Sequence, residues 1–195
     1  SQFSEGQRLD IAFSPLLSSF CSNICDLRIS FKLSNILVIL KSVTSPTFVE
    51  KFFQNGWIKT PGDIFLLEMN FGPGSEVEIR DCEGWGEQSA SNLFKAINSQ
   101  RVVSLARLIY AFGIRHVGEQ ASILLAKHFI SWTNFYANMI ASTDKQSPEW
   151  SNLVLIDGIG EMTASSLVQF FSMENSVWIT STLIKEIEVD DFSSN

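Results

Sequence analysis

Apolar residues recur at helical spacing along most of the chain from residue 46 onward. Residues 47–57, TFVEKFFQNGW, place four apolar side chains on one helical face, and Gly56 is a residue type that ends a helix. Residues 60–68, TPGDIFLLE, predict a second short helix, with Thr60 as the N-cap and Pro61 at the first helical position. The glycines and proline of MNFGPGSE then predict a linker.

The same period predicts further helices, separated by short connections that contain Gly, Ser or Pro. They run over Gln88 to Ile97, Val102 to Phe112, Glu119 to Phe129, Ser131 to Ala141, Glu149 to Leu155, Met162 to Ser172 and Ser176 to Ile187. Residues 1–45 are irregular, and within them residues 35–43 fit either a buried strand or a short helix. The sequence therefore predicts an all-α domain over residues 46–190, followed by a tail over 191–195.

Composition matters here chiefly through the distribution of charge. The 195 residues are 45% hydrophobic and 18% charged, with a net charge of −7, which argues against a uniformly basic nucleic-acid binder. Between residues 95 and 127, however, five basic residues accompany one acidic residue, whereas residues 174–191 hold five acidic residues and one lysine. The middle of the chain can therefore face a polyanion, and the C-terminal part cannot.

Neither a membrane span nor a metal site is expected. The longest apolar run, residues 36–40, is far too short to cross a bilayer, and the N-terminus lacks the basic start of a secretory signal, so we expect a cytoplasmic protein. Cys21, Cys25 and Cys82 lack the spacing of a disulfide framework. Cys21 and Cys25 stand four apart with no second Cys pair and no nearby His, so a tetrahedral zinc site would be two ligands short. We therefore expect reduced thiols and no metal.

One short motif occurs three times. CEGWGEQSASNL at 82–93 aligns with IDGIGEMTASSL at 156–167, so that two glycines and a glutamate coincide. A third copy, IRHVGEQASILLAK at 114–127, keeps the second glycine as Gly118 but has His116 at the place of the first. Such repetition rarely arises by chance and indicates a repeated structural unit.

Three interpretations of this motif compete. A dinucleotide-binding loop needs a third Gly or Ala and an acidic residue about 20 positions on, but Ser89 and Thr163 occupy the third place, and no acidic residue lies between Glu87 and Glu119. A turn that merely connects two helices explains one copy but not three. The third interpretation is a helix-hairpin-helix, in which Gly-apolar-Gly precedes a helix.

The helix-hairpin-helix interpretation has a physical basis for phosphate binding. Glycines permit positive φ and close approach of another backbone, and the helix that follows offers unpaired N–H groups at the positive end of its dipole. Such donors bind a phosphate without any lysine, so the net acidity of the chain is no obstacle. The apolar residues between the glycines, Trp85, Val117 and Ile159, are expected to point inward and hold the two helices together.

Four segments, LARLIYAFGIRHVGEQAS, CEGWGEQSASNL, NGWIKTPGDIFLLE and LIDGIGEMTASSL, together resemble the helix-hairpin-helix domain of bacterial NAD-dependent DNA ligases, over about residues 48 to 189. The resemblance implies a tandem helix-hairpin-helix region that binds nicked duplex DNA through main-chain contacts, without sequence preference, in an enzyme that seals nicks during DNA replication and repair. The expected DNA-binding residues are Gly84, Trp85, Gly86, Arg115, His116, Val117, Gly118, Gly158, Ile159 and Gly160.

The chain also departs from that family. The family has four hairpins, and the first would fall at SVTSPTF, which lacks glycines. The adenylated lysine of the family lies in Lys-x-Asp-Gly, but here LIDG has Leu155 in place of the lysine and KTPG has Pro61 in place of the aspartate. We therefore expect a non-catalytic fragment that binds none of the NAD, Mg and Zn of the parent family. This interpretation leaves room for a separate catalytic ligase half as a partner.

Two hypotheses follow from these departures. Residues 1–45 are hypothesised to be a degenerate or frame-altered segment in place of the barrel and zinc finger of the family. The rival function is a helical protein-interaction module that has lost DNA binding.

Single residues outside the glycines carry weaker signals. Arg115 is the best candidate for a phosphate contact, and His116 is expected mainly to shape the turn. Arg101 and Arg107 fit solvated helix faces equally well, and His128 is expected to interact with helix-terminal carbonyls. The aromatic residues at helical spacing are assigned to the core: Phe52, Phe94, Phe112, Trp132, Phe170 and Trp178.

Overall fold

A computed structural model describes residues 51–193, and these residues are mostly helical, as predicted. Residues 51–54 are helical, and the elements after them are η1 (Pro61–Leu66), α4 (Leu67–Phe71), η2 (Ile79–Asp81), α5 (Glu87–Asn98), β1 (Val102–Ser104), α6 (Leu105–Ala111), α7 (Glu119–Phe129), α8 (Trp132–Ala141), α9 (Pro148–Val154), α10 (Glu161–Ser172), α11 (Glu174–Ile184) and β2 (Glu188–Asp190). Residues 1–45, the segment SVTSPTF and the predicted helical positions before residue 51 lie outside the described residues.

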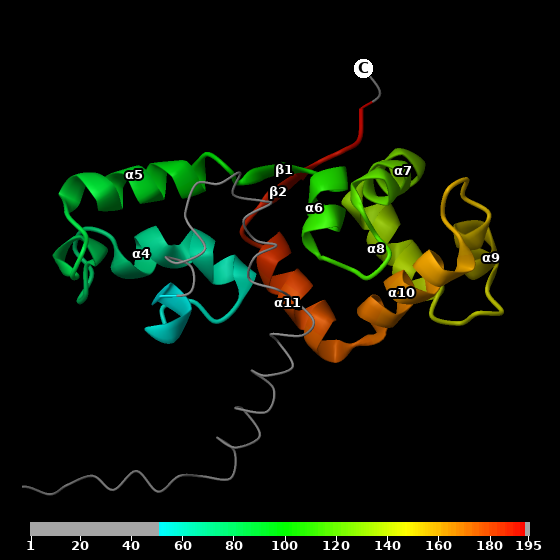
Figure 1. The fold of residues 1–195 in the computed structure, drawn as a ribbon, viewed down its shortest axis with the longest axis horizontal. Helices are drawn as coiled ribbons and strands as arrows, with labels where there is room; N and C mark the ends of the chain where they lie inside the picture. Colours follow the sequence, from blue (N-terminus) through cyan, green and yellow to red (C-terminus); the bar gives the residue numbers. More distant parts are fainter. Residues whose placement is uncertain (1–50, 194–195) are drawn as a thin grey trace, which may run out of the picture.

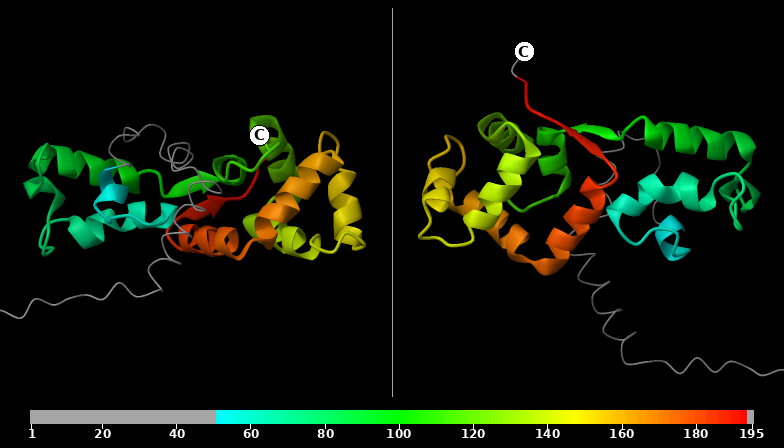
Figure 2. Two further views of the ribbon diagram at one scale, coloured as in Figure 1. Left: turned by 60° about the horizontal axis from the view of Figure 1, so that its bottom comes forward. Right: turned by 180° about the vertical axis from the view of Figure 1, so that it is seen from behind.

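The described chain forms two lobes (Figures 1 and 2). The first lobe, residues 51–100, contains η1, α4, η2 and α5, and the second lobe, residues 105–172, contains α6 to α10. Helix α11 and the two strands lie between the lobes in all views. Helix α11 packs on η1 of the first lobe and on α10 of the second.

In the first lobe, helix η1 begins where the sequence predicts. Thr60 is the N-cap of η1 and Pro61 follows it, but the capping oxygen comes from Asp63, whose Oδ2 accepts hydrogen bonds from the N–H groups of Lys59 and Thr60, both at 2.7 Å. The helix then continues as α4 to Phe71, so the linker predicted from residue 69 begins three residues too early. Tertiary packing extends the helix here, because the Phe71 ring stacks on Trp57 at 5.1 Å between ring centroids.

The second lobe has an aromatic core. Phe112, Phe135 and Phe171 are fully buried, and ring centroids lie 6.0 Å apart for Phe112 with Phe171 and 5.6 Å apart for Phe135 with Phe171. Trp132 is half-buried against the Phe112 ring at 5.9 Å. Phe170 is also buried, so the predicted core assignment of the aromatic residues is confirmed for this lobe.

A short parallel sheet replaces the start of one predicted helix. The sequence predicts a helix over 102–112, but Val102–Ser104 form β1 and pair with β2 in the register Val102↔Glu188, Val103↔Val189 and Ser104↔Asp190. Two adjacent β-branched valines favour this extended state once a partner strand is present. The same pairing explains why α11 ends at Ile184, three residues before the predicted end.

Two aromatic residues near the C-terminal end of the described chain have different surroundings. Trp178 on α11 is 50% exposed, so its predicted place in the core is wrong. Phe192, in the predicted tail, packs against the core, and its N–H donates to the Ile130 carbonyl at 2.7 Å. Among residues 51–193, no helix combines the length and the apolar character that crossing a membrane requires.

Candidate nucleic-acid interface

The three motif copies form three turns of the same backbone shape. We call them hairpin A (84–86, before α5), hairpin B (116–118, before α7) and hairpin C (158–160, before α10). The first residue of each has left-handed φ, with values of 83° for Gly84, 65° for His116 and 83° for Gly158. His116 therefore adopts the conformation that glycine provides in the other two copies, in agreement with its predicted turn role.

The middle residue of each turn faces the core. Val117 is 5% exposed and Ile159 is 2% exposed, while Trp85 is half-buried with its ring 5.7 Å from the Phe52 ring. Their N–H groups donate to the carbonyl three residues earlier, at 3.0 Å for Trp85, 3.0 Å for Val117 and 2.9 Å for Ile159. These three residues therefore lock the turns, and neither their N–H groups nor their side chains point to a ligand.

The third residue of each turn is a glycine that the fold does not require. Gly86, Gly118 and Gly160 are the N-caps of α5, α7 and α10, with φ of −157°, −88° and −78°, which any residue can adopt. Among the atoms of residues 51–193, apart from its chain neighbours, a Cβ at any of these positions would meet none within 4 Å. The space that these glycines leave open therefore faces outward and allows another molecule to approach the backbone.

The N–H groups at the three helix starts differ in availability. In hairpin A, the Gly86 N–H donates to Ser89 Oγ at 2.9 Å, and Ser89 Oγ also donates to the Gly86 carbonyl at 2.9 Å. Within the described part of the chain, the N–H groups of Gly118 and Gly160 have no such side-chain acceptor. Hairpins B and C thus present a free cap donor, and hairpin A does not.

Charge also distinguishes the hairpins. Hairpin B follows the exposed Arg115, whereas a carboxylate precedes each of the others, Glu83 at hairpin A and Asp157 at hairpin C. All three helices begin with an exposed glutamate, which stabilises the helix dipole but repels a phosphate. Hairpin B is therefore the most favourable of the three for an anion.

Hairpins B and C form one packed unit. A Cβ on Gly158 would lie 2.6 Å from Cδ1 of Leu124, which belongs to α7, the helix that follows hairpin B. A Cβ at position 158 would therefore require the Leu124 side chain to shift. Leu124 and Ser89 are contributors that the sequence analysis missed, although a serine three residues after an N-cap is a recognisable capping signal.

The other basic residues of the middle segment have structural surroundings. The Arg101 side chain donates hydrogen bonds to two backbone carbonyls, so the alternative of a solvated helix face is wrong for it. Arg107 is half-buried on α6, and this burial lowers the pKa of its guanidinium from the ordinary value. His128, in the last turn of α7, has its ring edge-on to Phe129 at 4.7 Å.

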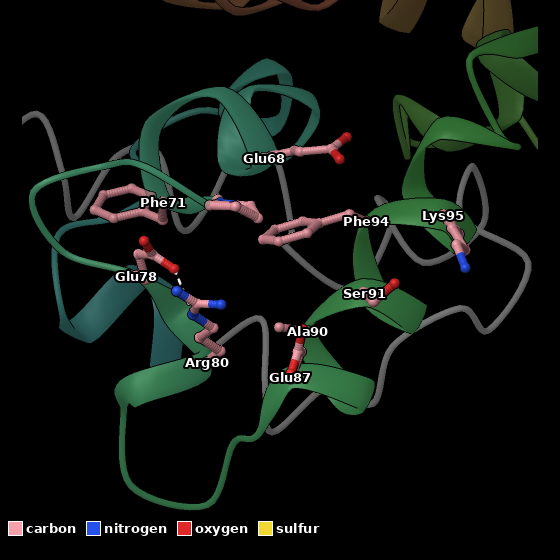
Figure 3. Close-up of a pocket in the computed structure, with 11 residues that line it drawn as sticks. Glu68, Phe71, Glu78, Arg80, Glu87, Ala90, Ser91, Phe94 and Lys95 are labelled. Atoms are coloured by element: carbon pink, nitrogen blue, oxygen red, sulfur yellow. Dashed lines mark ion pairs between the residues drawn. The ribbon is translucent and has the colours of Figure 1, made fainter.

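The first lobe contains a cavity of about 200 Å³ between α4, the loop after it, and α5 (Figure 3). Its wall includes Phe71, Phe94 and an ion pair of 2.6 Å between Arg80 Nε and Glu78 Oε2. Glu68 and Glu87 add two carboxylates, so the lining carries more acidic than basic groups. The cavity is therefore unsuited to a phosphate, although Glu87 directly follows hairpin A.

No group of three or more His, Cys, Asp or Glu residues within 51–193 could hold a metal ion. Cys82 is a free, half-buried thiol, and its Sγ contacts the Glu78 carbonyl at 3.5 Å. Cys21 and Cys25 lie outside the described residues.

Comparison with known proteins identifies the motif. Residues 107–179 match the family model for the helix-hairpin-helix motif, which spans hairpins B and C and excludes hairpin A. The chain is 47% identical over 120 residues to a DNA ligase of Roseobacter denitrificans, covering 62% of this chain and 17% of that protein. It is 40% identical over 140 residues to a DNA ligase of Dinoroseobacter shibae, covering 72% of this chain and 19% of the relative.

A more distant relative gives the same result. The DNA ligase of Pelobacter propionicus is 35% identical over 153 residues, covering 74% of this chain and 22% of its own length. The chain thus spans about a fifth of the length of the relatives it matches. Over the matched region, the chain is a helix-hairpin-helix domain of the DNA ligase family.

Proposed function

We propose that this domain binds duplex DNA without sequence preference, through the backbone N–H groups of hairpins B and C. The observation that carries the proposal is the set of three outward-facing glycines, Gly86, Gly118 and Gly160, at positions where φ is ordinary and no atom of the described residues restricts a side chain. A partner from outside the chain explains why these positions lack a Cβ. A phosphate backbone fits, because it can accept hydrogen bonds from successive N–H groups at a helix start.

Electrostatics support hairpin B as the strongest contact. Its helix α7 directs the positive end of its dipole outward, and Arg115 adds a full positive charge beside the turn. Such contacts read backbone shape and charge, and they do not reach the base edges that distinguish sequences. Binding should therefore be similar for all sequences and sensitive to salt.

We further propose that the domain serves a nick-sealing enzyme, because the relatives that it matches are named DNA ligases. In that role it would hold nicked duplex DNA, while joining of a 3′-hydroxyl to a 5′-phosphate, after NAD adenylates the enzyme, would need the Lys-x-Asp-Gly motif that this sequence lacks. NAD and Mg would act with that catalytic part, in a bacterial cytoplasm, during replication and repair of damaged DNA.

Fluorescence anisotropy with labelled duplexes tests the DNA-binding proposal. We expect nicked duplexes of two unrelated sequences to bind with equal affinity, and the affinity to fall steeply with added salt. If no duplex binds even at low salt, the rival function, a protein-interaction module that has lost DNA binding, replaces the proposal. The carboxylates beside hairpins A and C, Glu83 and Asp157, are the feature that favours that rival.

A further inference from the structure

Arg101 connects parts of the chain that are far apart in sequence. Its Nη2 donates to the Phe65 carbonyl at 2.6 Å, 36 positions away in the first lobe. Its Nη1 donates to the Glu186 carbonyl at 2.8 Å, 85 positions away between α11 and β2. The guanidinium also lies over the Phe65 ring, 5.4 Å from the centroid, and its Nε donates to Asn98 Oδ1 at 3.0 Å.

The backbone of Arg101 makes a matching connection. Its carbonyl accepts a hydrogen bond from the Glu188 N–H at 2.8 Å, directly before the parallel pairing of Val102 with Glu188. Residue 101 also belongs to the short stretch between α5 and β1, where the chain leaves the first lobe. Arg101 therefore lies at the covalent connection between the lobes and bonds to the first lobe and to the segment between α11 and β2, whose helix α11 packs on α10 of the second lobe.

A second contact of the first lobe with the elements between the lobes lies at Gly62 of η1, which packs on α11. A Cβ on Gly62 would lie 2.9 Å from the Thr182 carbonyl oxygen of α11, so the two backbones touch at this point. A separate contact elsewhere resists rotation of the first lobe about α11 more than this packing does alone. The hydrogen bonds of Arg101 provide this separate contact.

This rotation matters because hairpin A lies in the first lobe and hairpins B and C lie in the second. Linked binding elements reinforce one another only when their geometry lets them engage the same partner at once. We propose that Arg101 is a positioning residue that fixes the orientation of hairpin A relative to hairpins B and C. The effect of this orientation on binding to a single duplex rests on the proposed function, whereas the fixed orientation itself does not.

Arginine is specifically suited to this position. The planar guanidinium presents its N–H groups in a rigid fork, so one side chain can reach the Phe65 and Glu186 carbonyls together. A lysine would keep the charge but has a single donor group on a flexible stem. Arg101→Lys should therefore keep the positive charge but lose the fixed orientation.

The test measures orientation first, without DNA. In the full chain with its three cysteines replaced by serine, spin labels at Lys95→Cys on α5 and Lys127→Cys on α7 report the distance between the lobes by pulsed electron resonance. We expect one narrow distance distribution for the parent and a broad one for Arg101→Ala and Arg101→Lys. The matched control is Arg80→Ala, whose ion pair with Glu78 lies within the first lobe and should leave the distribution narrow.

DNA binding provides a second readout. Duplexes of about 24 base pairs should bind the parent about threefold more tightly than duplexes of about 8 base pairs, because only the longer ones reach hairpin A together with hairpins B and C. In Arg101→Ala this preference should disappear, with affinity for the short duplex unchanged. A mere loss of stability would not change the length preference of molecules that circular dichroism shows to be folded at the measuring temperature.

The outcomes separate the two proposals. A narrow, unshifted distance distribution in both Arg101 variants would overturn the positioning role. A broad distribution with an unchanged length preference would support the fixed orientation and overturn its consequence for binding a single duplex. If the parent binds no duplex, the proposed function fails, and the distance distributions alone decide whether Arg101 fixes the lobes; Arg101→Lys replaces Arg101→Ala in this decision if the alanine variant does not fold.

Discussion

Hairpin A and the pair of hairpins B and C have nearly the same motif in different surroundings. Hairpin A follows the short η2, has a half-buried Trp85 as its middle residue, and has its cap N–H bonded to Ser89. Hairpins B and C follow α-helices, have fully buried aliphatic middle residues, and pack on each other through Leu124. The same Gly-x-Gly sequence therefore predicts the turn, and its neighbours decide whether the turn is a rigid, open donor site.

The largest expected effect is the loss of stability when the buried middle residue of hairpin C is replaced. An exposed neighbour serves as the control. Ile159→Asp places a carboxylate at a position that is 2% exposed, and we expect a loss of about 3 kcal/mol or more in the free energy of unfolding. The control Met162→Asp lies three residues on at 66% exposure and should change stability by about 0.5 kcal/mol or less. Urea unfolding compares the two, and equal losses would show that Ile159 does not lock the turn.

A pair of alanine substitutions compares the first glycines of hairpins A and C. Gly84 and Gly158 share a φ of 83°, so both variants lose about 1–2 kcal/mol of stability from backbone strain. Gly158→Ala should lose up to about 1 kcal/mol more, because its Cβ forces the Leu124 side chain to shift, whereas that of Gly84 meets no atom of the described residues within 4 Å. Equal losses in urea unfolding would contradict the packing of hairpin C against α7.

Substitutions of the third glycines of hairpins A and C should differ in their effect on DNA affinity. Gly160→Glu places a carboxylate where a phosphate should approach, and we expect about a tenfold or greater loss of affinity, about 1.4 kcal/mol or more. Gly86→Glu should cost about threefold or less, because the Gly86 N–H is already bonded to Ser89. Anisotropy titrations measure both, with Gly160→Gln as an uncharged control of similar size.

Both proteins should retain parental helicity in circular dichroism, because neither Cβ meets another atom within 4 Å. If Gly160→Glu leaves affinity unchanged for every duplex, hairpin C is structural only.

The smallest effect concerns the charge at hairpin B. Arg115→Gln should lower the slope of log affinity against log salt by about 1, the value for one phosphate contact, with the same change for all sequences. Lys127→Gln, an exposed cation in the last turn of the same helix α7, is the matched control and should leave the slope unchanged. Identical slopes for both variants would mean that Arg115 does not contact a phosphate.

Much of the local structure follows directly from the sequence. The predicted starts and ends of α5, α7, α8, α9 and α10 agree with the structure within two residues, because each has an apolar period of 3.6 and a clear cap. The three turns are also predictable, since positive φ at Gly84 and Gly158 is a local requirement of the motif. That His116 adopts the same conformation follows from its alignment with these glycines.

Other features depend on residues that are distant along the chain. No local signal shows that Val102–Ser104 pair with Glu188–Asp190, that Arg101 bonds to Phe65 and Glu186, or that Trp178 lies half in solvent. The sequence determined the helices, the repeated turns and the family resemblance, because dihedral preference and apolar period act within a few residues. The tertiary structure alone decided how the lobes are joined and how hairpin C packs on α7, because those properties depend on where distant segments meet.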